Sequence, residues 1–224
     1  MKTVILDGAR VAPSKVVCVG RNYVEHIKEL NNEVPTSMVL FMKPNAALSS
    51  ELVTGKQTPL HYEGEISFLM KQGKINAVGF GLDLTNRELQ SELKGKGLPW
   101  ERAKAFDGAA VMSQFVSVEA TDIDKLSMQL WINDVLVQEG NIDLMIHKPL
   151  SVIDEINSFS TLTDNDIVMT GTPKGVGSYV KGDKFVGKIF LINFFAFIYS
   201  GKCFCFHYFF QVLLHFFRAV SDNA

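Results

Sequence analysis

The sequence of 224 residues predicts one domain of the α+β class, mainly β. Short apolar runs outnumber helical stretches, and 47% of the residues are hydrophobic, which is enough for one sizeable core. Strand-like runs lie at 16–20, 39–42, 66–70, 126–137 and 167–169. Helical stretches lie at 24–30, 84–94 and 150–159. Within 126–137, Asn133-Asp134 predicts a hairpin turn, and 138–141 is expected to form a loop.

Charge and cysteine content restrict the class of protein. The net charge of −2 gives no electrostatic reason to expect nucleic acid or a membrane as a partner. The cysteines, Cys18, Cys203 and Cys205, form no metal-binding pattern, and their spacing favours a reducing compartment. The N-terminus lacks the long apolar segment of a signal peptide. These features predict a cytoplasmic globular protein.

Three carboxylates suggest a metal site. Glu63 and Glu65 lie two apart at the start of a strand-like run, so they project to the same face. Like charges side by side are costly unless a cation lies between them, and Mg²⁺ or Mn²⁺ prefers carboxylate oxygens. Asp83 follows a glycine-punctuated apolar run and would complete a three-carboxylate site. The alternative is a solvated strand end whose charges face water.

A second set of residues suggests proton transfer. His26 and Glu29 are three apart in a helical stretch, hence neighbours on one face. A carboxylate beside an imidazole orients the ring and raises its pKa, which is a general-base arrangement. An ordinary surface pair is the alternative. Lys104 could stabilise developing negative charge on a substrate or could be a solvated surface lysine.

Several separated motifs resemble the fumarylacetoacetate hydrolase family, in its short single-domain acylpyruvate hydrolase and oxaloacetate decarboxylase form. The resemblance covers about residues 16–188. The motifs are Glu63-x-Glu65, Asp83-x-Thr85-x-Arg87, Lys104-Ala105-Phe106-Asp107 and Thr170-Gly171-Thr172-Pro173.

The resemblance implies a mixed β-sandwich or roll with short helices, and a homodimer. It implies that Glu63, Glu65 and Asp83 bind Mg²⁺ or Mn²⁺ and that His26 and Glu29 form the catalytic dyad, with Lys104 beside the substrate. Substrate-binding roles are expected for Arg21, Gln90, Gly171 and Thr172, the last two in a glycine-containing loop that holds a substrate carboxylate.

The expected function is a metal-dependent enzyme acting on small 2-oxo or β-dicarbonyl acids. A metal-bound enolate is shared by acylpyruvate C–C hydrolysis, oxaloacetate decarboxylation and keto–enol tautomerisation. The sequence leaves the choice among these three reactions open. Alternatives from other classes are a non-catalytic relative that kept the fold and a tail-anchored membrane protein.

The C-terminal residues differ from the rest. The sequence predicts a catalytic domain over 1–188 and an atypical tail over 189–224, which holds ten of the 17 Phe. Its two apolar runs lack the alternation of a half-buried strand, and neither reaches the roughly 18 residues of a membrane span. We hypothesise a change of reading frame near Lys188; the alternative is a genuine docking or membrane hairpin.

Overall fold

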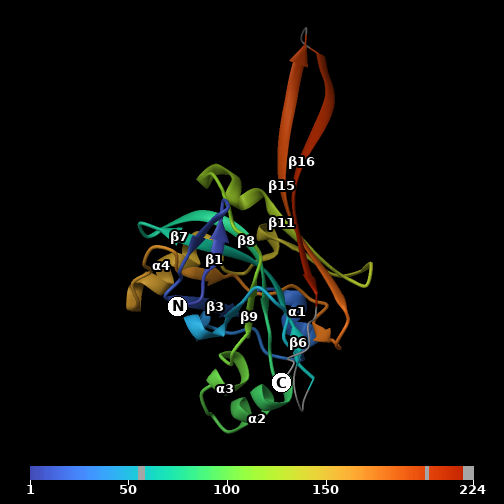
Figure 1. The fold of residues 1–224 in the computed structure, drawn as a ribbon. Coiled ribbons are helices and arrows are strands. Elements are labelled where there is room, and N and C mark those ends of the chain that lie inside the picture. Colours follow the sequence, from blue (N-terminus) through green and yellow to red (C-terminus); the bar gives the residue numbers. More distant parts are fainter. Residues whose placement is uncertain (55–58, 200–201, 219–224) are drawn as a thin grey trace.

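The computed structural model describes residues 1–54, 59–199 and 202–218, with side chains described as far as residue 191. Within these residues the chain is α+β and mainly β, as predicted (Figure 1). Two larger sheets form the body, and short helices lie around them.

The larger sheet is mixed and has eight strands within the described residues. Its order is β4-β3-β13-β7-β8-β9-β5, and β10 pairs with β8 outside this path. Strand β13 runs parallel to β3, and β5 runs parallel to β9. The bounds are β3 Lys15–Gly20, β4 Val39–Pro44, β5 Leu48–Ser49, β7 Gly64–Lys71, β8 Lys74–Asp83, β9 Ala110–Met112, β10 Val116–Ser117 and β13 Ile167–Met169.

A four-stranded sheet in the order β12-β11-β15-β16 packs on one face of the larger sheet. Phe80 of β8 meets Leu130 of β11 and Phe185 of β15 in a shared core. Gly187 permits this approach, because a Cβ there would lie 2.5 Å from the Phe80 ring. The strands of this sheet and of two small ribbons are β11 Leu126–Ile132, β12 Val135–Asn141, β15 Lys184–Tyr199, β16 Lys202–Arg218, β1 Val4–Leu6, β2 Ala9–Val11, β6 His61–Tyr62 and β14 Gly177–Ser178.

Two-residue turns close the hairpins that matter for the site. Gln72-Gly73 joins β7 to β8 with φ of +51° and +71°, and Asn133-Asp134 joins β11 to β12 with φ of +49° and +65°. Positive φ at both positions matches the twist of the flanking strands. The predicted turn at 133–134 is therefore confirmed. The loop expected at 138–141 is wrong, because these residues continue β12 and pair with β11.

Three helices lie close to their predicted positions: α1 Val24–Glu29, α2 Arg87–Gly95 and α4 Pro149–Phe159. The short helix α3 Glu101–Lys104 and the 3₁₀ turns at Asn45–Ala47, Ala120–Lys125 and Ile142–Leu144 were not predicted. Helix α2 begins three residues after the predicted start. The Asn86 side chain caps it by accepting a hydrogen bond from the Leu89 N–H at 3.1 Å, so the preceding residues stay extended. Helix α4 covers the larger sheet with Val152, Ile153 and Ile156.

The C-terminal runs are strands despite their lack of alternation. Strand β15 pairs with β11 as far as Leu191, and beyond that point it pairs with β16 alone. Backbone pairing needs no alternation, and β-branched and aromatic residues favour extended chain. The hairpin extends beyond the body at the top of Figure 1. The proposed change of reading frame concerns residues mostly outside those whose side chains are described.

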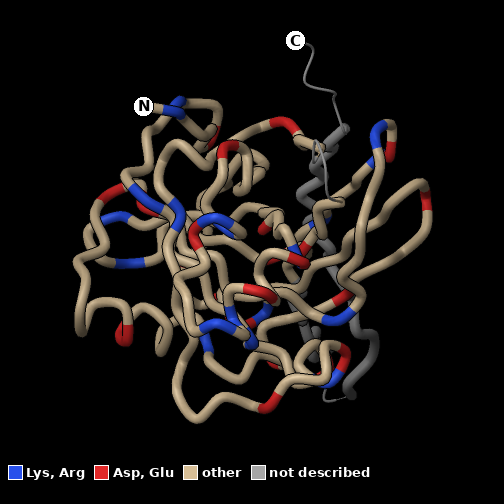
Figure 2. Tube along the Cα trace, turned by 90° about the horizontal axis from the view of Figure 1, so that it is seen from below, with Lys and Arg blue, Asp and Glu red and all other residues tan. Residues whose placement is uncertain are grey.

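Charges of both signs are mixed along the described trace, as Figure 2 shows. This agrees with the small net charge. No helix among the described residues is long and apolar enough to cross a membrane.

Asp166 ties the starts of β3 and β13 together. Its fully buried carboxylate accepts hydrogen bonds from Ser14 Oγ and Lys15 Nζ, both at 2.6 Å, and from the Thr163 N–H at 2.8 Å. Burial by itself would raise the pKa of Asp166, but the hydrogen bonds from Lys15, Ser14 and Thr163 outweigh it and lower the pKa.

Replacing this carboxylate should destabilise the fold. At pH 7 we expect Asp166→Asn to lower the free energy of unfolding by about 3 kcal/mol, since one partner of a buried ion pair is lost. The folded-state pKa lies below the unfolded one, so this stability is present above about pH 4 and is lost as pH falls through the folded-state pKa. Urea unfolding should therefore show that the difference in free energy of unfolding between wild type and Asp166→Asn becomes smaller as the pH falls towards 3. Asp154→Asn, at an exposed position on α4, is the control; equal stability of wild type and Asp166→Asn at pH 7 would contradict this account.

Candidate active site

The β7–β8 hairpin gathers the three predicted carboxylates. Its register sets Glu65 opposite Gly81, and the Asp83 N–H donates to the Glu63 carbonyl at 2.9 Å. Ligand oxygens of Glu63, Glu65 and Asp83 all lie within 4.8 Å of one another, and all three residues are buried. The solvated alternative is therefore wrong for these carboxylates.

Three cations converge on this cluster. Lys104 Nζ lies 2.8 Å from Glu63 Oε2 and 2.7 Å from Asp83 Oδ2, and it also donates to Thr85 Oγ1 at 2.6 Å. Lys43 Nζ lies 2.7 Å from Asp83 Oδ1, and Arg87 pairs with Glu63. A carboxylate is expensive to bury alone, and these contacts offset that cost for Glu63 and Asp83.

The pKa shifts follow from these pairs. Burial alone would raise the pKa of Glu63, but the charges of Lys104 and Arg87 hold it well below its usual range. Burial would lower the pKa of Lys104, but Asp83 and Glu63 raise it. Lys104 is therefore a permanent cation at neutral pH.

Glu65 is the exception, because no described cation contacts its carboxylate. Glu65 Oε2 accepts a hydrogen bond from the Gly171 N–H at 2.7 Å. Burial and the charges of Asp83 and Glu63 raise the pKa of Glu65 well above its usual range. Gly171 has φ of +96°, and a Cβ there would lie 2.8 Å from Asn22 Cβ, so only glycine brings this N–H to the carboxylate.

This donor set fits a divalent cation. Three carboxylate oxygens converge, and Glu65 forms no ion pair with a described lysine or arginine, so a bound divalent cation would stabilise its ionised form. Glu63, Glu65 and Asp83 are the residues that would hold Mg²⁺ or Mn²⁺.

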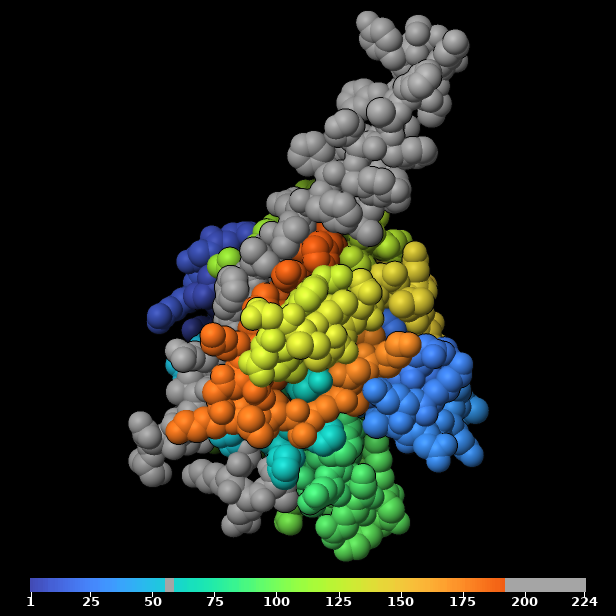
Figure 3. Space-filling model, turned by 90° about the vertical axis from the view of Figure 1, so that its right-hand side faces the viewer, coloured from blue at the N-terminus to red at the C-terminus, as the bar shows by residue number. Residues whose placement is uncertain are grey.

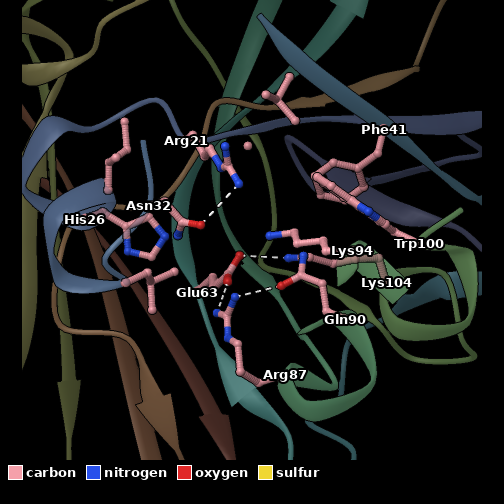
Figure 4. A pocket seen from close by; sticks show the side chains of 14 residues that line it. Arg21, His26, Asn32, Phe41, Glu63, Arg87, Gln90, Lys94, Trp100 and Lys104 are labelled. Carbon is pink, nitrogen blue, oxygen red and sulfur yellow. Dashed lines mark hydrogen bonds and ion pairs between the residues drawn. The ribbon is translucent and has the colours of Figure 1, made fainter. Parts of the chain in front are cut away.

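A pocket opens beside the cluster, between α1, β4 and α2 (Figure 4). Glu63 and Lys104 line one side, and His26 lines the other. His26 Nδ1 lies 3.2 Å from Glu29 Oε2, and Glu29 also accepts from the Gly175 N–H at 2.9 Å. Figure 3 shows the α1 segment (blue) adjoining the chain after β13 (orange). The predicted His26–Glu29 pair therefore exists and lies at the pocket.

Residues 15–191 match the model of the family described as fumarylacetoacetate (FAA) hydrolase, C-terminal. The chain belongs to the fumarylacetoacetate hydrolase family. The family and its mainly β fold, both expected from the sequence, are confirmed. The family's members include enzymes, so the prediction of an enzyme is confirmed as well.

Two curated relatives carry the same name. Oxaloacetate tautomerase YcgM of Escherichia coli is 39% identical over 188 residues, covering 76% of this chain and 86% of the relative. The mitochondrial oxaloacetate tautomerase oaa1 of Schizosaccharomyces pombe is 36% identical over 188 residues, covering 75% of this chain and 85% of the relative. A solved structure of fumarylpyruvate hydrolase from Pseudomonas aeruginosa, in complex with Mn²⁺ and pyruvate, has a TM-score of 0.78 at 27% identity and covers 84% of this chain and 91% of that one.

Other predicted residues divide between the pocket and its support. Arg21 and Gln90 line the pocket, and their role in substrate binding stays a prediction. Gly171 and Thr172 do not: Gly171 holds Glu65, and the Thr172 hydroxyl donates to the Gly64 carbonyl at 2.9 Å. Gln138 completes this support, because its side chain contacts both the Gly64 N–H and Thr172 Oγ1 at 2.8 Å.

Some pocket residues were not predicted from the sequence. Phe41 and Trp100 form an aromatic wall with ring centroids 6.0 Å apart, and Asn32 and Lys94 also line the pocket. A usable signal existed for Lys94, because Arg87, Gln90 and Lys94 follow the i, i+3, i+7 spacing of one helical face. The aromatic wall joins two segments far apart in sequence, so no local pattern could reveal it.

Proposed function

We propose that this chain catalyses the keto–enol tautomerisation of oxaloacetate or a closely related small 2-oxo acid, with Mg²⁺ or Mn²⁺ as cofactor. The observation that carries the proposal is the proton-transfer pair His26–Glu29 facing a buried carboxylate cluster across one pocket. The names of the Escherichia coli and Schizosaccharomyces pombe relatives support this reaction. When bound, the cation would supply a Lewis acid that draws electron density from the keto oxygen.

His26 is suited to move the proton. Its Nδ1 is engaged by Glu29, which fixes the ring and leaves Nε2 to accept a proton from the carbon between the two carbonyl groups. Glu29 is itself fixed by the Gly175 N–H. Returning the proton to oxygen completes the tautomerisation with no net change in the protein.

Lys104 stabilises the negative charge that develops on the substrate. Its raised pKa keeps it from acting as a base, and its three N–H groups already donate to Glu63, Asp83 and Thr85, so it acts through its positive charge. Gln90 is positioned to bind a substrate carboxylate: its amide oxygen accepts from Arg87 Nη1 at 2.8 Å, which leaves its NH₂ group as a donor towards the pocket.

C–C hydrolysis of acylpyruvates is the second candidate, because the same His26–Glu29 pair could activate a water molecule. The fumarylpyruvate hydrolase from Pseudomonas aeruginosa supports it. Oxaloacetate decarboxylation would proceed through the same enolate but needs no attacking water.

We also propose a homodimer, as the family resemblance implies; a monomer by light scattering at micromolar concentration would contradict this. The cytoplasmic location stays a prediction, and the Schizosaccharomyces pombe relative is named as mitochondrial.

Activity should require a divalent cation. Saturating Mg²⁺ should stabilise the wild type by about 2.7 kcal/mol at 100 times its Kd, raising the Tm. Glu65→Gln, or alanine at Glu63 or Asp83, should abolish both activity and the Mg²⁺-dependent Tm shift. Glu92→Gln, at an exposed position paired with Lys96, is the control. Undiminished activity in excess chelator, with no metal by elemental analysis, would refute the proposal.

Replacing His26 should separate the reactions. We expect His26→Ala to reduce ketonisation of enol-oxaloacetate and cleavage of acetylpyruvate by roughly 10²–10⁴-fold, the range for loss of a general base. Decarboxylation of oxaloacetate should survive better, because it removes no proton to reach the enolate. All three rates are measured with Mg²⁺ present. Lys28→Ala, in the exposed Glu25–Lys28 pair on the same helix, is the control.

The outcomes distinguish the candidates. Wild-type ketonisation far exceeding cleavage supports the tautomerase, and the reverse supports the hydrolase. Unchanged rates in His26→Ala would remove this residue from the mechanism.

A further inference from the structure

One face of α2 lines the pocket. Arg87, Gln90 and Lys94 follow in i, i+3, i+7 spacing, and all three are pocket residues. Arg87 forms an ion pair with Glu63, and it also donates a hydrogen bond to the Gln90 amide oxygen. Lys94 is the last of the three, half-buried and one turn beyond Gln90 (Figure 4).

Lys94 is a positioned cation without a carboxylate. Its Nζ lies 4.6 Å from the centroid of the Trp100 ring, and Trp100 is in turn braced by Phe41. Among the described residues no acidic side chain forms an ion pair with Lys94, whereas Lys104 contacts two. The aromatic wall therefore holds the Lys94 ammonium at the pocket without neutralising it.

Arg21 is a second uncompensated cation in the same pocket. Its described side-chain partner is neutral: Nη2 donates to Asn32 Oδ1 at 3.1 Å. Its Nε is buried with no partner in the described part of the chain. Its backbone has φ of +58°, which is unusual for a residue with a branched or long side chain and is often found at functional sites.

Arg21 and Lys94 act on each other. Burial, followed by the charges of Arg21, Arg87 and Lys104, lowers the pKa of Lys94 to about 8, and Glu63 opposes this shift. The remaining charges near the pocket are accounted for. Lys43, Lys104 and Arg87 pair with the carboxylate cluster, and Glu29 binds His26 and the Gly175 N–H.

We infer that Arg21 and Lys94 bind a second carboxylate of the substrate and so select 2-oxo dicarboxylates over 2-oxo monocarboxylates. The inference rests on the proposed function for the position of the reacting 2-oxo group. Both cations line the same pocket, and neither forms an ion pair with a described acidic side chain, so an anionic ligand would neutralise them. A carboxylate accepts hydrogen bonds from both an ammonium and a guanidinium. Lys94 is thus a specificity-determining residue that contacts no reacting atom.

The test compares binding of two non-reacting ligands at pH 7 with Mg²⁺ present. L-malate carries two carboxylates and L-lactate carries one, and both have an oxygen next to the first. By calorimetry, wild type should bind malate more tightly than lactate. Lys94→Met keeps the length and packing of the side chain but should weaken malate binding about 10- to 100-fold, the loss expected for one charge-assisted hydrogen bond. Its lactate affinity should stay within about twofold, which also reports an intact fold.

Two further variants separate charge from structure. Lys94→Arg keeps the cation and should retain the preference for malate. Lys96→Met, at the C-cap of α2 in the exposed pair with Glu92, should behave as wild type. Steady-state assays should agree: Lys94→Met should raise the KM for oxaloacetate more than it lowers kcat.

The inference and the proposed function can fail separately. An unchanged malate preference in Lys94→Met, or no preference in wild type, overturns the inference even if oxaloacetate is turned over. Loss of the preference in Lys94→Met, in a protein that turns over no 2-oxo acid, supports the inference and overturns the proposed function.

Discussion

The burial of three carboxylates on one hairpin is the constraint on which the rest of the site depends. Carboxylate oxygens of Glu63, Glu65 and Asp83 lie within 4.8 Å of one another, and all three residues are buried. Like charges at this separation repel strongly in a medium of low dielectric, and each also loses its hydration. The chain can fold in this way only if cations are delivered to the same place.

Those cations come from three separate elements. Lys43 lies on β4, Arg87 on α2 and Lys104 at the end of α3, and each pairs with Glu63 or Asp83. The ion pairs that offset the cost of burying the carboxylates also set the protonation state of Lys104. Lys104 stays protonated because of Asp83 and Glu63, so it can stabilise negative charge on a substrate. Glu65 has no such partner, which leaves the cluster ready for a divalent cation.

Backbone groups also hold the glutamates in place. The Gly171 N–H reaches Glu65 only because a glycine allows the backbone to pass against Asn22. Gln138 and Thr172 then anchor the backbone of Gly64 between the two glutamates. Glycine and threonine in the segment after β13 therefore position the clustered glutamates, and the pocket itself is lined by residues of α1, β4 and α2.

The sequence by itself determined the Glu63–Glu65 pair, the His26–Glu29 pair, the strands β3, β4, β7, β11 and β13, and the helices α1, α2 and α4, because these depend on spacings of two to four residues within one element. Asp83 lies on the neighbouring strand, and the β7–β8 register brings it to the two glutamates. The i, i+3, i+7 spacing of Arg87, Gln90 and Lys94 also places these residues on one face of α2. Only the tertiary structure decided that Gly171 and Thr172 brace the cluster instead of lining the pocket, that residues 138–141 continue a strand, and that Phe41 and Trp100 hold Lys94. Each of these depends on contacts between segments far apart in the chain, and close packing in three dimensions, which no periodicity encodes, selects them.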